Sequence, residues 1–131
     1  MTATHKKHVF LKDLHFEHRL WLDELSFSKD QLGVFTTRLA EVEEKNTASD
    51  FKVYAESFQN RLIRQKEVID KLSYDIKEHE TALVDYAEEF PIAIDHVHFS
   101  DHDKLREKMI RFTALYAEFK GEFMRFLAKW M

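Results

Sequence analysis

The chain has 131 residues, 44% of them hydrophobic and 34% charged, and it contains two glycines, one proline and no cysteine. Average usage would give about nine glycines and six prolines at this length, so the residues that make the turns of β-sandwiches, barrels and doubly wound sheets are missing. We therefore expect one all-helical domain over residues 1–131, with enough apolar residues to form a core.

The net charge is −4, and acidic and basic residues are interspersed along every segment. This pattern gives no reason to expect a nucleic acid or an acidic membrane as a partner. No stretch has the apolar character of a signal peptide or of a membrane span, so a cytoplasmic location is expected. Because cysteine is absent, any bound metal ion must rest on histidine and carboxylate ligands.

The first predicted helix covers residues from about 6 to 46. Its apolar positions alternate in steps of three and four, which is a heptad seam without a skip. The seam positions are Leu11, Leu14, His18, Trp21, Leu25, Ser28, Leu32, Phe35, Leu39 and Val42. Gly33 falls within this pattern, so it is predicted to lie inside one long helix. After residue 46, Ser49 or Asp50 can accept a hydrogen bond from the first free amides of the next helix.

The second predicted helix covers about 50–90 and ends at Pro91, because proline cannot donate to the helical ladder and clashes with the preceding turn. Its seam positions are Phe51, Ala55, Phe58, Leu62, Gln65, Ile69, Leu72, Ile76, His79, Leu83, Tyr86 and Phe90. A long connection is expected next, which places His96 and His98 in a loop.

The third predicted helix covers about 101–130. Ser100, followed three residues later by Asp103, resembles a capping box with aspartate in place of glutamate. The seam continues through His102, Leu105, Met109, Phe112, Tyr116, Phe119, Phe123, Phe126 and Trp130. Three long helices joined in this way predict an elongated, antiparallel, up-down-up bundle. Further apolar residues lie outside the strict seam, so the chain can form a homodimer or pack against a partner helix.

The most informative seam positions are those that carry polar residues: His18, Ser28, Gln65, His79 and His102. If the turn near residue 48 is the point of reflection between antiparallel helices, His18 and His79 lie at one level of the core. Placing Trp130 level with Phe51, so that the bundle closes flush at that end, brings His102 to the same level. Starting the third helix level with the end of the second moves His102 by about nine residues, or roughly 13 Å, towards the bundle end.

Three core imidazoles at one level predict a transition-metal site, because neutral imidazole binds such ions and burying three without partners is costly. Zinc and iron are favoured by ligand type, while copper and nickel remain open. His15 lies one turn before His18 and can share an ion with it. The candidate ligands and orienting residues are His18, His79, His102, His15, His98 and Asp75. Other carboxylates near this level are Glu17, Glu78, Glu80, Asp101 and Asp103.

Other functions have less support in the sequence. There is no glycine-rich phosphate loop, no zinc-protease helix and no nucleophile elbow, so a role without catalysis is favoured. The Glu-x-x-His pairs of di-iron carboxylate bundles are also absent. The alternative to metal binding is a structural or adaptor bundle that associates through its apolar stripes. In that case the histidines are polar core and surface residues.

Overall fold

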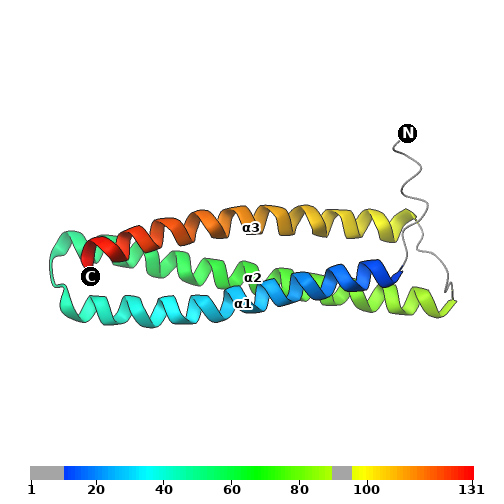
Figure 1. Cartoon of the computed structure of the whole chain (residues 1–131), viewed down its shortest axis with the longest axis horizontal. Coiled ribbons are helices and arrows are strands. Elements are labelled where there is room, and N and C mark those ends of the chain that lie inside the picture. The colour runs from blue at the N-terminus through cyan, green and yellow to red at the C-terminus, as the bar shows by residue number, and fades with distance from the viewer. Residues whose placement is uncertain (1–10, 90–95) are drawn as a thin grey trace.

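The computed structural model describes residues 11–89 and 96–131, and in the second range it describes side chains from residue 100 onward. These residues form three helices, α1 (Leu11–Lys45), α2 (Ser49–Glu89) and α3 (His96–Trp130), and the described ranges contain no strand. The helices pack side by side along the long axis of the molecule, with the end of α3 beside the connection between α1 and α2 (Figure 1). The prediction of an all-helical chain of three long helices is confirmed.

The helix ends near residue 48 follow the predicted pattern to within one residue. The side chain of Asp50 accepts a hydrogen bond of 2.9 Å from the amide of Phe51, as expected for an acceptor at the start of a helix. The side-chain amide of Asn46 donates to the carbonyl oxygens of Val42 and of Trp130 at the end of α3. The predicted start of the first helix near residue 6 and the break at Pro91 lie outside the described residues.

The predicted start of the third helix near residue 101 is wrong, because α3 begins five residues earlier, at His96. Ser100 and Asp103 resemble a capping box in sequence, yet both lie inside the helix. The residues from 96 to 100 include no proline or glycine that would stop a helix from forming earlier. His96 and His98 are therefore part of α3 and not of a loop. His98 precedes His102 by one helical turn.

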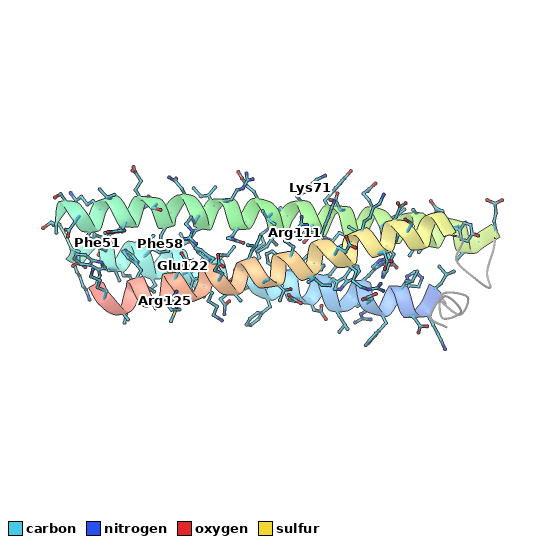
Figure 2. The ribbon with its side chains drawn as sticks, turned by 90° about the horizontal axis from the view of Figure 1, so that it is seen from above. Phe51, Phe58, Lys71, Arg111, Glu122 and Arg125 are labelled. Atoms are coloured by element: carbon cyan, nitrogen blue, oxygen red, sulfur yellow. The ribbon has the colours of Figure 1, made fainter. Side chains whose placement is uncertain are left out.

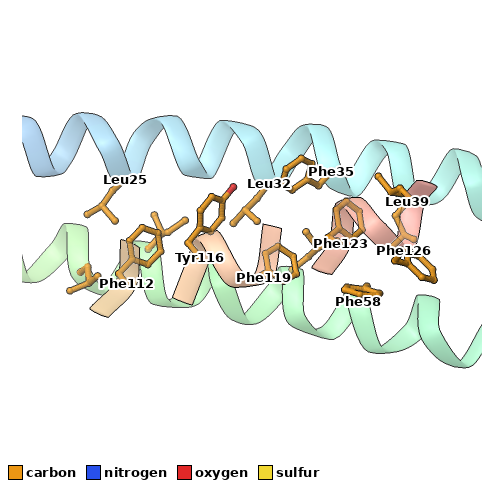
Figure 3. Close-up of a cluster of buried hydrophobic side chains, with 14 of the residues drawn as sticks. Leu25, Leu32, Phe35, Leu39, Phe58, Phe112, Tyr116, Phe119, Phe123 and Phe126 are labelled. Carbon is orange, nitrogen blue, oxygen red and sulfur yellow. The ribbon is translucent and has the colours of Figure 1, made fainter. Parts of the chain in front are cut away.

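The core follows the heptad seam. In α1 the buried residues are the ten predicted seam positions. In α2 and α3 the described seam residues are buried as well, except that Gln65, Tyr86 and Trp130 are half-buried. Large rings fill the interior, as Figure 3 shows, and the ring centroids of Phe58 and Phe126 lie 4.6 Å apart. Phe123 is completely buried between its neighbours.

Contacts across the bundle fix how the helices are aligned. Lys29 pairs with Asp70 at 2.8 Å, and the ring centroids of Phe51 and Trp130 lie 5.2 Å apart. Phe51 and Phe58 lie at the end of the molecule where α1 connects to α2, while charged side chains project outward along the helices (Figure 2). The end of α3 is therefore level with the start of α2, as the flush alignment assumed. None of the described helices has an apolar stretch long enough to cross a membrane.

A layer of histidines divides the apolar core into two parts. The larger part extends from Trp21 and Leu105 to the aromatic end of the bundle. The smaller part consists of Leu11, Leu14 and Leu83 at the opposite end. The layer between them is formed by His18, His79 and His102, which are 1%, 8% and 0% exposed. Together with Ser28 they are the buried polar side chains of the described core, which makes this layer the candidate functional site.

Candidate metal centre

Each helix contributes one imidazole to the histidine layer. The ring centroid of His18 lies 5.3 Å from that of His79 and 4.9 Å from that of His102, and the remaining pair is 5.6 Å apart. One ring nitrogen from each histidine lies within 4.8 Å of one from each of the others. The structure thus brings the three core histidines to one level, as the seam alignment predicts.

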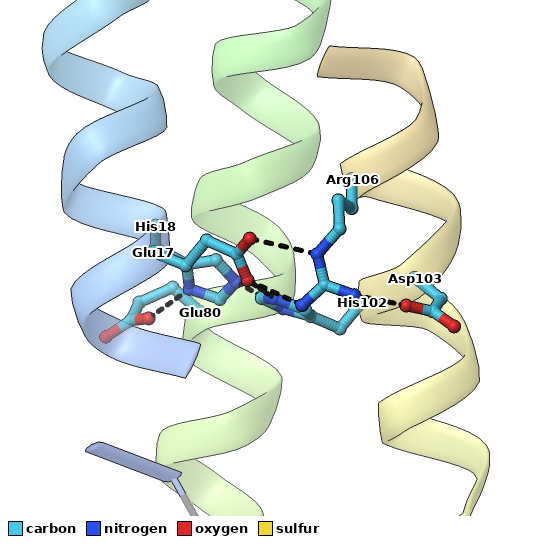
Figure 4. A network of polar contacts seen from close by, with 6 residues as sticks. All are labelled: Glu17, His18, Glu80, His102, Asp103 and Arg106. Atoms are coloured by element: carbon cyan, nitrogen blue, oxygen red, sulfur yellow. Dashed lines mark hydrogen bonds and ion pairs between the residues drawn. The ribbon is translucent and has the colours of Figure 1, made fainter. Parts of the chain in front are cut away.

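Two of these imidazoles contact each other directly. Nε2 of His18 lies 3.1 Å from Nδ1 of His102. Each ring uses its other nitrogen to contact a carboxylate. Nδ1 of His18 lies 2.5 Å from Oε1 of Glu80, and Nε2 of His102 lies 2.7 Å from Oε1 of Glu17 (Figure 4). The contacts therefore form a continuous path from Glu80 through His18 and His102 to Glu17.

The carboxylates determine which ring nitrogens carry protons. An ionised carboxylate only accepts hydrogen bonds, so His18 must donate from Nδ1–H and His102 from Nε2–H. In the neutral rings, the facing nitrogens of His18 and His102 then each present a lone pair to the other. Two lone pairs at 3.1 Å repel each other unless a cation or a proton lies between them.

Arg106 completes the network on the α3 side. Its Nε and Nη2 donate to the two oxygens of Glu17 at 2.9 and 2.7 Å, and its Nη1 pairs with Asp103. The hydrogen bonds from Arg106, aided by that from His102, outweigh partial burial and lower the pKa of Glu17 to about 2. The same pairing raises the pKa of Arg106. Glu17 is thus a fixed anion beside the His102 ring.

Burial has the opposite effect on His102. It lowers the pKa of this imidazole despite the hydrogen bond to Glu17, and the neighbouring His18 lowers it further. The neutral ring, which offers a lone pair, is therefore the favoured form. Trp21 stacks on the same ring, with centroids 4.9 Å apart and planes 25° from parallel, and so restricts its orientation.

The other predicted site residues lie in different surroundings. His15 does not join the layer, but its Nδ1 lies 2.7 Å from Oε2 of Glu80. Asp75 makes ion pairs with Lys71 at 3.1 Å and with Lys108 at 3.9 Å. The side chain of His98 lies outside the described part of the structure. The structure therefore assembles two overlapping sets of donors, one of the three core histidines and one of His15, His18 and Glu80.

Sequence reasoning placed Glu17 and Glu80 near the layer without assigning them a role, and it missed Arg106. Arg106 lies one turn after His102 and flanks the seam of α3, where it can reach across to α1. The sequence signal for this role is a charged residue, Arg106, close to a polar seam position, His102. Such residues are usually solvated, which is why the signal alone does not single it out.

The chain matches no known family model, and no curated protein or solved structure matches it. A buried set of three imidazoles, with two carboxylates holding ring protons away from the centre, can hold a metal ion or a shared proton.

Proposed function

We propose that this chain is an up-down-up three-helix bundle that binds one divalent transition-metal ion between His18, His79 and His102. The observation that carries the proposal is the pair of facing nitrogens of His18 and His102, 3.1 Å apart. Glu80 and Glu17 hold the protons of these rings on their far sides. The two lone pairs therefore point into the interior, which is the arrangement that a metal ion needs.

The spacing of these nitrogens supports the same conclusion. Two nitrogens bound about 2.0–2.1 Å from a tetrahedral zinc ion lie about 3.3 Å apart. The observed separation of 3.1 Å is close to this value before any ion is considered. His79 provides a third nitrogen within 4.8 Å, and water can take the fourth position. Zinc and iron are the ions expected from the type of ligand. Copper(II) nevertheless has the higher affinity for nitrogen ligands in general.

A proton competes with the metal ion for the same place. If His18 takes a second proton, its Nε2–H can donate to Nδ1 of His102 and the repulsion between lone pairs disappears. The protonated pair cannot bind a metal ion, because ligands must be deprotonated. Metal affinity is therefore expected to fall as the pH is lowered, because protons then occupy the ligand nitrogens.

Metal content and fluorescence together test this proposal. The untagged protein, purified without chelator, is analysed by plasma mass spectrometry and then titrated with zinc after removal of bound ions. Trp21 stacks on His102, whereas Trp130 lies at the opposite end of the bundle. In a Trp130→Phe background, emission from Trp21 should change until one zinc ion has been added per chain.

Two variants separate the loss of ligands from the loss of packing. His79→Ala should reduce zinc affinity at least tenfold, because it removes one of the three donors. Leu83→Ala removes a completely buried side chain one turn further along α2 and leaves every donor in place. It should therefore lower stability but retain zinc. Less than about a tenth of an ion per chain in the parent with no uptake of zinc, or equal affinity in His79→Ala, would contradict the proposal.

A stripe of exposed apolar residues on α1 favours a second function, association with another helix. Leu20, Phe27 and Val34 lie seven residues apart and are 51%, 65% and 66% exposed. Side chains at this spacing line one face of a helix, which is how helices associate. A homodimer or a complex with a partner helix would cover this face. Light scattering should then show a dimer that Phe27→Lys converts to a monomer, while a parent protein that is monomeric at all concentrations would contradict self-association.

A further inference from the structure

A second set of donors lies on the outer side of His18. His15 and His18 are one turn apart on α1, and their Nδ1 atoms lie 2.7 and 2.5 Å from the two oxygens of Glu80 on α2. The donors of all three residues lie within 4.8 Å of one another. The side chains of His15 and Glu80 are 33% and 36% exposed, whereas that of His18 is 2% exposed. This set therefore opens to solvent, unlike the buried layer.

His18 belongs to both sets, and it faces each with a different nitrogen. Its Nε2 lies 3.1 Å from His102 in the core, and its Nδ1 faces Glu80. We propose that His15, His18 and Glu80 bind a second metal ion, which shares the imidazole of His18 with the first as a bridge. This inference rests on the proposed function, because a bridge requires an ion in the layer. It adds a solvent-accessible ion to a buried one.

The charge of Glu80 suits this role. Burial alone would raise the pKa of this carboxyl, but contacts with His18 and His15 outweigh burial and hold the pKa below its usual value. The carboxylate is thus ionised at neutral pH. With two imidazole nitrogens and one carboxylate oxygen, the donors are of the kind that zinc and copper(II) accept. Water can occupy the remaining positions, because His15 and Glu80 reach the surface.

The second ion displaces one proton. When only the first ion is bound, Nδ1 of His18 retains its hydrogen and donates it to Glu80. When the second ion binds, the Nδ1–H bond breaks, the proton leaves to the buffer and a metal–nitrogen bond forms in its place. No electron is transferred, and the negative charge of the resulting imidazolate is shared by the two cations. Binding of the second ion should therefore release one proton from His18, in addition to any released from His15.

Copper(II) is the probe that reports a bridge directly. The untagged full chain is freed of metal and titrated with copper(II) at neutral pH, with the bound ions counted and the paramagnetic resonance signal recorded. We expect the signal to grow up to one ion per chain and to fall as the second binds, because two copper(II) ions joined by an imidazolate pair their spins. His15→Ala should bind one ion and retain its full signal.

A matched substitution and the stoichiometry separate the possible outcomes. Asp13→Ala removes an exposed carboxylate from the turn of α1 that contains His15, and it should leave both ions in place. Two ions with undiminished signals, or two ions in His15→Ala, would overturn the bridge. One ion per chain would overturn the second site and leave the proposed function standing. Failure to bind any ion would overturn both.

Discussion

At the scale of single residues, the most consequential contacts in the bundle are those of Glu17. This carboxylate accepts hydrogen bonds from both Arg106 and the buried ring of His102. Through the second contact it determines the tautomer of His102, and with it the nitrogen that faces His18. The function proposed for the layer therefore depends on a residue that is not itself a ligand.

Replacing Glu17 by glutamine should weaken zinc binding about 10–100-fold, as is typical when the partner of a metal-binding histidine is removed. The amide keeps the shape of the side chain but removes the negative charge that holds the proton on Nε2. Competition with a chromogenic chelator measures this change. Glu24→Gln is the matched control, since Glu24 lies two turns along the same face of α1 and instead accepts a hydrogen bond from Thr113. Equal zinc affinity in both variants and the parent would refute the role of Glu17.

Tyr116 gives a prediction that does not involve the metal centre. Burial raises the pKa of this phenol to about 12 from 10.0, and its hydroxyl donates to Gln31 at 2.8 Å. Because the folded state holds this proton more tightly than the unfolded state, the stabilisation is complete below pH 10 and is lost as the pH rises towards 12. The loss amounts to about 2–3 kcal/mol in the free energy of unfolding.

Urea unfolding measured at several pH values between neutrality and the alkaline limit tests this prediction. Tyr116→Phe should cost about 1 kcal/mol at neutral pH, because a hydrogen bond is lost, and should show a smaller alkaline loss than the parent. Tyr74→Phe alters an exposed tyrosine on α2 and should retain the parent's pH profile. The prediction fails if Tyr116→Phe and the parent lose stability equally at high pH.

At the scale of the helices, Gly33 is a weak point in α1. It lies in the middle of this helix on an exposed position, and a β-carbon there would meet no atom within 4 Å. Gly33→Ala should therefore raise the free energy of unfolding by about 0.5–1 kcal/mol, because alanine loses less backbone entropy in a helix. Thermal or urea unfolding measures the gain. Ala40→Gly, at another exposed position of α1, should produce a loss of similar size; a destabilised Gly33→Ala variant would show that the glycine has another role.

The helices also show how far the sequence leads. A strict heptad predicts burial well, because one face of a long helix must pack inward along its whole length. It also predicts that His18 and His79 meet, since a short turn fixes the alignment of α1 and α2. The level of His102 required an assumption about α3, which the contact of Trp130 with Phe51 supports.

Two features of the helices could not be obtained in this way. The sequence does not reveal that α3 starts at His96, because a serine followed by an aspartate, as at Ser100 and Asp103, fits the interior of a helix as well as its start. The pairing of Arg106 with Glu17 depends on how closely α1 and α3 approach each other. A repeat of apolar residues along one helix carries no information about that distance.

At the scale of the whole molecule, the bundle has two unequal ends. Closely packed aromatic rings, including those of Phe51, Phe58 and Phe126, fill the end near the connection between α1 and α2. At the opposite end, the described residues beyond the histidine layer form a small cluster of Leu11, Leu14 and Leu83, with Ala87 packed against it. Local opening is cheapest where few apolar contacts must be broken. The histidine end should therefore open more readily than the aromatic end whenever no metal ion joins the three helices.

Hydrogen exchange followed by mass spectrometry should show this difference directly. In the metal-free protein, amides in residues 11–18 and 79–89 should exchange faster than those in residues 35–42 and 116–126. Zinc at about 100 times its dissociation constant stabilises the bound state by about 2.7 kcal/mol. Hydrogen exchange that requires an opening which releases the ion then becomes about 100-fold slower. At the same zinc concentration the slowing at the histidine end should be at least about tenfold smaller in His79→Ala, because this variant binds zinc at least tenfold more weakly. Equal exchange at the two ends of the metal-free protein would contradict the prediction, because the histidine end would then open only when the whole chain unfolds.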